Sequence, residues 1–269
     1  MKLKTIIDEI TEILVGLLRS TLIEIRLRGI LGVLIRVPTY LRYRKVRSYS
    51  NNVDKFTYIW KKNLWGSTES VSGPGSTLYN TQNLRSQLPI LFKKFSIGSI
   101  VDAPCGDFNW MKHVIPESGI TYTGIDVVDN LIVENKIKYS NSFINFYQAD
   151  LIMEVCPRSD LLISRDFLFH LSQEDIFKFL TNFLSSETNL LLSTTHKMGL
   201  FVNSDIKTGD FRRIDLFAHP YHFSCEPLFS FDDYTLGDFP REMCLWSRQQ
   251  VIEVVVGARC SLKCVTPDS

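Results

Sequence analysis

The feature that most constrains this chain is a series of short apolar stretches separated, in most cases, by segments with helical spacing. The stretches occupy 99–102, 122–126, 144–150, 160–164 and 189–195. Strands that alternate with helices in this way form a parallel sheet with right-handed crossovers. The chain is therefore predicted to fold as an α/β protein around such a sheet.

The C-terminal part departs from this alternation. Residues 227–231 and 242–246 have the character of strands and are separated by a turn rich in Asp and Gly, which predicts an antiparallel hairpin. The complete prediction is a doubly wound, Rossmann-like sheet of seven strands, mostly parallel and closed by this hairpin, with an N-terminal helical extension. Helices are also predicted over 48–70, 77–95 and 173–184, the last capped by Ser172.

A chain of 269 residues accommodates one α/β domain of about 200–250 residues with an extension. We divide it into a basic amphipathic segment at 1–48, a helical cap with a Gly/Ser loop at 49–97, and a core at 98–266. The core carries an insertion at 200–226, before the hairpin.

The charge is unevenly distributed. The net charge is +1, but residues 1–47 hold ten basic and four acidic residues, which leaves −5 for the remainder. Charges interrupt every apolar run of membrane-spanning length, and no signal-peptide pattern is present, so a cytoplasmic protein is expected. The basic stretch at 19–47 suits either the inner surface of an anionic membrane or packing on the core or on a second copy in a homo-oligomer. The acidic remainder has no nucleic-acid motif, so no nucleic-acid partner is expected.

The six cysteines are scattered and form no C-x-x-C pair. This arrangement predicts free thiols in a reducing compartment, with neither a disulfide framework nor a zinc site. His219 and His222 have the spacing of a metal pair but lack a third ligand at a suitable distance in the sequence. No metal is expected.

The strongest chemical motif follows the first strand, which ends at Asp102 and continues into a turn containing Gly106. A helix is expected after this turn. Ligands of open α/β sheets bind at the carboxyl ends of the strands, and a glycine lets the backbone approach them closely. The carboxylates of Asp102 and Asp107 disfavour a pyrophosphate and favour a cationic ligand. The dinucleotide pattern G-x-G-x-x-G is absent, which argues against a nicotinamide enzyme.

Two further carboxylates, Asp126 and Asp150, are predicted to end the next two strands. At position 126 a carboxylate can accept both hydroxyls of a ribose, and at position 150 a side chain can reach an adenine edge. Each aspartate alone is equally well explained as a cap or turn residue. Acidic ends on three successive strands indicate a nucleoside site.

These residues resemble the class I S-adenosylmethionine-dependent methyltransferases. The matching segments are 101–106, 124–126, 149–150, 160–164 and the final hairpin. A narrower similarity, to a mostly uncharacterised bacterial-type group, is carried by the motifs at 69–76, 102–110, 165–171 and 209–212. The resemblance covers about residues 60–250. It implies methyltransferase activity and S-adenosylmethionine as the cofactor, held by Asp102, Ala103, Cys105, Gly106, Asp126, Asp150 and Leu151. The common glycine-rich turn is replaced here by a bulkier one.

The methyl acceptor is expected to meet the segment after the fourth strand. His170 lies four residues from Asp166, so on a helical turn Asp166 would orient His170 as the general base for a hydroxyl. The alternatives are a structural Arg165–Asp166 pair and a His170 that only fills the corner. Arg165, His196 and Arg212 are candidate acceptor contacts, Arg212 through a carboxylate or phosphate, although a surface arginine is the commoner case.

The Asn-Pro-Pro-Tyr type motif of amino-group methylation is absent, which favours oxygen as the methylated atom. The predicted reaction is O-methylation of a small polar, sugar or glycan acceptor, lipid-linked if the N-terminal segment contacts a membrane. A non-catalytic Rossmann-like binding or scaffold protein is the alternative. An oxidoreductase on the same sheet is a weaker third hypothesis.

Overall fold

The computed structural model describes residues 43–116, 118–197, 202–235 and 238–263. It divides into two units, one ending at Ser48 and one beginning at Tyr49. Within the first unit the described residues contain a short 3-10 helix, η1 (Val46–Ser48). Most of the basic stretch predicted at 19–47 therefore lies outside the described residues. None of the described helices has the length and apolar character needed to cross a membrane.

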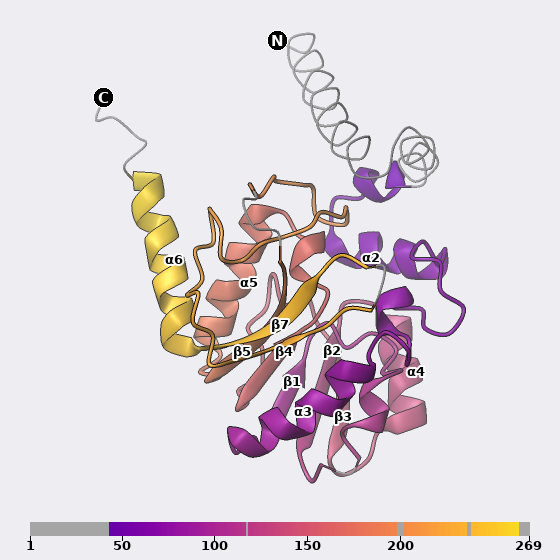
Figure 1. The fold of residues 1–269 in the computed structure, drawn as a ribbon. Helices are drawn as coiled ribbons and strands as arrows, with labels where there is room; N and C mark the ends of the chain where they lie inside the picture. Colours follow the sequence, from indigo (N-terminus) through magenta and orange to yellow (C-terminus); the bar gives the residue numbers. More distant parts are fainter. Residues whose placement is uncertain (1–42, 117, 198–201, 236–237, 264–269) are drawn as a thin grey trace. The chain divides into compact units, whose positions relative to one another are not determined.

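The second unit is built on a seven-stranded sheet in the order β3-β2-β1-β4-β5-β7-β6 (Figure 1). The strands are β1 (Ser99–Asp102), β2 (Thr121–Asp126), β3 (Ile144–Gln148), β4 (Leu161–Ser164), β5 (Leu190–His196), β6 (Phe229–Asp232) and β7 (Arg241–Ser247). The first five are parallel, and β7 runs antiparallel to both β5 and β6. This confirms the predicted mostly parallel sheet with its C-terminal hairpin.

Within the described residues, five α-helices accompany the sheet. They are α2 (Asn52–Lys61), α3 (Gln82–Lys94), α4 (Asp129–Tyr139), α5 (Gln173–Ser185) and α6 (Arg248–Lys263). The helix α4 contacts β2 and β3, while α5 contacts α6. The crossovers through α4 and α5 move in opposite directions along the sheet, so right-handed connections place these helices on opposite faces. As predicted, Ser172 caps α5, because its hydroxyl accepts the amide of Asp175.

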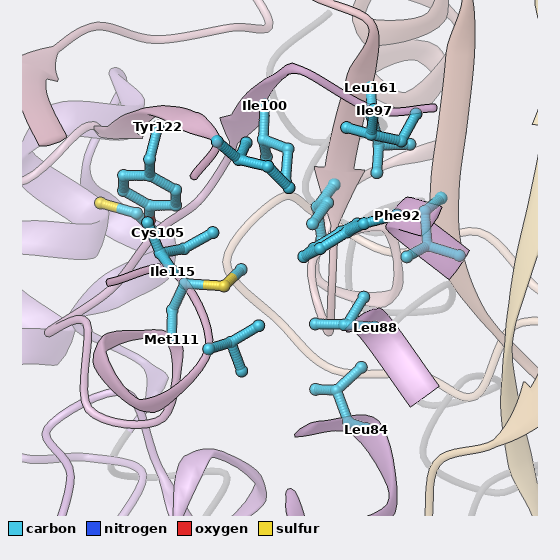
Figure 2. Close-up of a cluster of buried hydrophobic side chains, with 14 of the residues drawn as sticks. Leu84, Leu88, Phe92, Ile97, Ile100, Cys105, Met111, Ile115, Tyr122 and Leu161 are labelled. Carbon is cyan, nitrogen blue, oxygen red and sulfur yellow. The ribbon is translucent and has the colours of Figure 1, made fainter. Parts of the chain in front are cut away.

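The core that positions the strands lies between α3 and the sheet. Leu84, Leu88 and Leu91 recur at helical spacing and are fully buried, as expected for a helix with one apolar face. Figure 2 shows Leu84 and Leu88 in one cluster of apolar side chains that also contains Ile100 and Tyr122 of the sheet. Burying one such side chain contributes about 1.5–3 kcal/mol, so this contact stabilises the packing of α3 against the sheet.

Three parts of the fold differ from the sequence prediction. The expected helix after the first turn is absent: residues 103–110 form a loop followed by one 3-10 turn, η3 (Met111–His113). A positive φ at Phe108 interrupts any helix there, and Pro116 limits its extension. The helix predicted over 48–70 is confined to α2, and α6 was not predicted.

Candidate functional site

A cavity of about 310 Å³ opens beside the carboxyl ends of the parallel strands. Its walls come from α2, the loop at 71–76, the turn after β1, the ends of β2 and β3, and the segment after β4. Such a position is the usual ligand site of an open α/β sheet. The cavity therefore brings together the segments that the sequence singled out for ligand binding.

Asp126 ties the turn after β1 to the end of β2. Its Oδ2 accepts the amide of Gly106 at 3.1 Å, and its Oδ1 accepts the amide of Val128 at 3.0 Å. A carboxylate has about four acceptor positions, so Asp126 keeps acceptor capacity for a ligand hydroxyl. Burial raises the pKa of Asp126 to about 6, although the backbone donors oppose this rise.

The other predicted nucleoside contacts lie along the same wall. Asp150 follows β3 by two residues rather than ending it, and it accepts the side-chain amide of Asn52 at 2.9 Å. Ala103, Cys105 and Leu151 are buried and line the cavity. Burial raises the pKa of the Cys105 thiol well above its usual value, so this sulfur acts as an apolar wall atom.

Asp102 is the predicted cofactor residue that does not line the cavity. It lies two residues after Ile100, and alternate residues of a strand share a face, so its side chain points into the core beneath α3. There its Oδ2 accepts the hydroxyl of Tyr122 at 2.7 Å. Burial raises the pKa of Asp102 to about 7. Asp102 therefore lies in the core and not in the wall of the cavity.

The loop at 69–76 is fastened over the turn by Asp107. The Asp107 carboxylate accepts the hydroxyls of Ser70 at 2.9 Å and Ser72 at 3.2 Å, together with the amide of Val71 at 3.0 Å. A Cβ on Gly106 would lie 2.1 Å from the Ser72 hydroxyl, so only glycine allows this contact. The motifs at 69–76 and 102–110 were both recognised in the sequence, but their contact with each other was not predicted.

A cluster of two arginines and two aspartates lies beside the cavity, which Arg165, Asp166 and Arg241 line. Arg165 donates to Asp233 from Nε at 2.8 Å and from Nη2 at 3.2 Å, and also to the carbonyl of Gly75 at 3.0 Å. Arg165 Nη1 lies 3.4 Å from Asp166, and Arg241 Nε lies 3.5 Å from it. Arg165 is therefore held mainly by Asp233, which lies 68 residues away in the sequence. This partner was not predicted.

Asp166 remains ionised within this cluster. Burial acts to raise the pKa of its carboxyl, but the charges of Arg165 and Arg241 outweigh burial and hold that pKa below its usual value. A carboxylate with a lowered pKa is a weak proton acceptor near neutral pH. Asp166 is thus better suited to holding the arginines than to removing a proton.

His170 ends the 3-10 helix η4 (Leu168–His170) and lines the cavity. Its Nδ1 lies 2.8 Å from the carbonyl oxygen of Asp210. A carbonyl only accepts, so Nδ1 carries the hydrogen and Nε2 carries the lone pair. The predicted orientation by Asp166 is therefore wrong: the main chain of Asp210 orients this ring. Burial lowers the pKa of His170, which favours the neutral form.

Two predicted acceptor contacts, His196 and Arg212, do not line the cavity. His196 is buried at the end of β5, with Nδ1 3.3 Å from the carbonyl of Ile214, and burial lowers its pKa to about 4. Arg212 is buried rather than on the surface, and it donates to the carbonyl of Leu171 and the hydroxyl of Tyr221. Both residues fasten the 200–226 segment to the core.

Several residues that line the cavity were not predicted from the sequence. These are Asn52, Phe56, Trp60, Trp65, Phe211 and Arg241. The aromatic residues before the Gly/Ser loop were visible in the sequence, but only folding shows that they cover this edge of the sheet. Among the described residues no group of three metal-binding side chains occurs.

The architecture of the second unit is that of the class I S-adenosylmethionine-dependent methyltransferases. A Leishmania major S-adenosylmethionine-dependent methyltransferase aligns with 77% of this chain and 90% of its own, with a TM-score of 0.55 and 14% identity. The 1,6-didemethyltoxoflavin-N1-methyltransferase of Burkholderia thailandensis, solved with its substrate and S-adenosylhomocysteine, aligns with 77% and 88%, with a TM-score of 0.54 and 11% identity.

Magnesium protoporphyrin IX methyltransferase from Synechocystis PCC 6803, solved with S-adenosylhomocysteine, aligns with 76% of this chain and 98% of its own. Its TM-score is 0.51 and its identity 14%. No family model matches the chain, and no curated protein matches it in sequence. At these identities the similarity concerns the fold, and the acceptors of the neighbours differ from one another.

Proposed function

We propose that this protein is an S-adenosylmethionine-dependent methyltransferase that methylates a hydroxyl group of a small polar acceptor, such as a sugar or glycan. The observation that carries the proposal is the composition of one cavity. Its walls join the carboxylates of Asp126 and Asp150 to a neutral His170 whose Nδ1 is occupied by Asp210. Nucleoside-binding groups and a proton acceptor thus face the same space.

The residues at the first end fit a nucleoside. The remaining acceptor capacity of Asp126 suits a ribose hydroxyl, and Leu151 and Cys105 offer apolar walls for a base. The carboxylates at this end also favour a cation. When bound, S-adenosylmethionine supplies an electrophilic methyl group on a positively charged sulfur.

At the other end, His170 is suited to receive the proton of the acceptor hydroxyl at Nε2. A positioned general base typically accelerates a reaction about 10²–10⁴-fold. Alignment of the reactants by the cavity walls can lower the barrier by a further ~7–11 kcal/mol at best. The aromatic rings of Trp65 and Phe211 lie 5.7 and 5.8 Å from the His170 ring and provide flat surfaces for an acceptor.

Calorimetric titration of the full chain with S-adenosylhomocysteine, and with NAD as the comparison, tests this proposal. We expect binding of S-adenosylhomocysteine only, and its loss in Asp126→Ala. Binding of NAD instead would indicate an oxidoreductase. Binding without production of S-adenosylhomocysteine from S-adenosylmethionine, across a panel of hydroxylated acceptors, would favour the non-catalytic alternative.

The basic stretch at 19–47 supports a second, separate proposal of contact with an anionic membrane surface. Eight basic residues and one acidic residue occur there among apolar side chains, a pattern typical of interfacial segments. Co-sedimentation with anionic liposomes at low and high salt tests it, with a variant lacking 1–47 as the comparison. No binding at low salt would instead favour packing or a homo-oligomer, which sedimentation of the protein alone would detect.

A further inference from the structure

The cavity is lined by a guanidinium group with two donor nitrogens that make no hydrogen bond within the described residues. Arg241 begins β7 and lines the cavity. Its Nε lies 3.5 Å from Asp166 Oδ1 and 3.8 Å from Asp233 Oδ2, at the long end of ion-pair distances. Both Nε and Nη2 are buried, and within the described part of the chain neither has a hydrogen-bond partner. Leaving buried charged donors unpaired is costly, so a ligand is expected to supply the acceptor.

The neighbouring Arg165 differs in this respect. It donates three hydrogen bonds, to Asp233 and to the carbonyl of Gly75, and so has a structural role. The two arginines, with Asp166 and Asp233, form a cluster of zero net charge. Because the cluster is already neutral, an added anion is held by hydrogen bonds to the unpaired Arg241 donors, and burying one negative charge there costs less than burying two. A planar carboxylate also matches the geometry of a guanidinium edge.

A second unused donor lies in the same cavity. Trp65 Nε1 is buried and, among the described residues, has no hydrogen-bond partner. Its ring lies 5.7 Å from the ring of His170. The loop at 69–76 lies close to both side chains: a Cβ on Gly73 would lie 3.1 Å from Trp65 Cβ, and a Cβ on Gly75 would lie 3.6 Å from Arg241 Nη2. Trp65 thus lies next to His170, and Arg241 lies next to Asp166, four residues before His170.

We infer that the methyl acceptor is a hydroxy acid whose carboxylate is bound by Arg241, with the indole N–H of Trp65 as a further donor and the hydroxyl facing His170. This inference rests on the proposed function. In the reaction the hydroxyl oxygen bonds to the methyl carbon as the carbon–sulfur bond breaks. The electron pair of that bond stays on sulfur, and the hydroxyl proton passes to His170. The carboxylate is assigned to the acceptor because the carboxylates of Asp126 and Asp150 occupy the other end.

The experiment uses the full chain saturated with S-adenosylhomocysteine and two matched pairs of probes, D-glucuronate with D-glucose and 3-hydroxybenzoate with phenol. Calorimetry should show the carboxylate binding at least tenfold more tightly than its neutral partner in one or both pairs. Arg241→Met should remove this preference, and Arg241→Lys should restore part of it. Arg158→Met, at an exposed position, is the control and should behave as the unchanged protein.

The outcomes separate the inference from the function on which it rests. Failure of the unchanged protein to bind S-adenosylhomocysteine overturns both. Normal binding of S-adenosylhomocysteine with equal affinity for carboxylate and neutral probes overturns the hydroxy-acid inference alone. A tenfold loss of S-adenosylhomocysteine affinity in Arg241→Met also overturns it, since the carboxylate would then belong to the cofactor. If Arg241→Met does not fold, the inference is tested by the carboxylate preference of the unchanged protein and by its change in Arg241→Lys.

Discussion

Replacing Asp107 by alanine is expected to release the loop at 69–76 while leaving the sheet folded. The Asp107 carboxylate accepts three hydrogen bonds from this loop, at 2.9, 3.2 and 3.0 Å. A hydrogen bond to a charged group contributes about 1.5–3 kcal/mol. The site is partly buried, so we take the lower limit for each bond and expect a loss of about 4.5 kcal/mol from the closed loop. At about 1.4 kcal/mol per factor of ten, the open population rises on the order of a thousandfold.

Native-state hydrogen exchange measures this change residue by residue. In Asp107→Ala the amides of 70–78 should exchange faster by about two to three orders of magnitude, while those of β1 and β4 should keep their protection. Affinity for S-adenosylhomocysteine should fall as well, because the loop lines the cavity. Asp107→Asn, which keeps the shape but loses the charge, should give a smaller effect. Unchanged loop exchange, or a uniform increase across the sheet, would refute the reasoning.

Four further predictions follow from other contacts. Affinity for S-adenosylhomocysteine should be constant above pH 7 and decrease below about pH 6. Burial raises the pKa of Asp126 to about 6, so at lower pH its carboxylate takes up a proton and loses acceptor capacity. Calorimetry of Asp126→Asn should not show this pH dependence. His170→Gln should reduce turnover at least about 10²-fold with normal cofactor affinity, and near-normal turnover would show a positioning role. Gly106→Ala should weaken cofactor binding, since its Cβ would meet Ser72 at 2.1 Å; unchanged affinity would contradict the close contact. Leu88→Ala should lower the free energy of unfolding by about 2–5 kcal/mol in urea denaturation, and a change below 1 kcal/mol would contradict its place in the core.

Most of the secondary structure was predictable because it depends on local periodicity. The predicted strand at 122–126 and the observed β2 (Thr121–Asp126) differ by one residue, and Ser172 caps α5 as its position in the sequence suggested. The helix predicted after β1 does not form. The side chains of Asp107 and Asn109 instead make hydrogen bonds with the loop at 69–76. Local sequence spacing carries no information about such a distant partner.

The candidate site was likewise predictable in part from the sequence and in part only from the folded structure. The sequence alone determined that carboxylates gather at the ends of neighbouring strands, because parallel strands bring their carboxyl ends to one edge of the sheet. It did not determine which side chains face the cavity. A period of two tells which residues share a face, but only packing under α3 decides that the face of Asp102 is the core.

The partners of the charged residues were decided by tertiary structure alone. Arg165 meets Asp233 across 68 residues, and His170 meets the carbonyl of Asp210 across 40. A hydrogen bond requires two atoms within about 3 Å, and for segments so far apart that distance depends on the register of the sheet and the path of the 200–226 segment. Local sequence determined the strands and the types of residue at the site. Their pairing, the tautomer of His170 and the unused donors of Arg241 were determined only when the chain had folded.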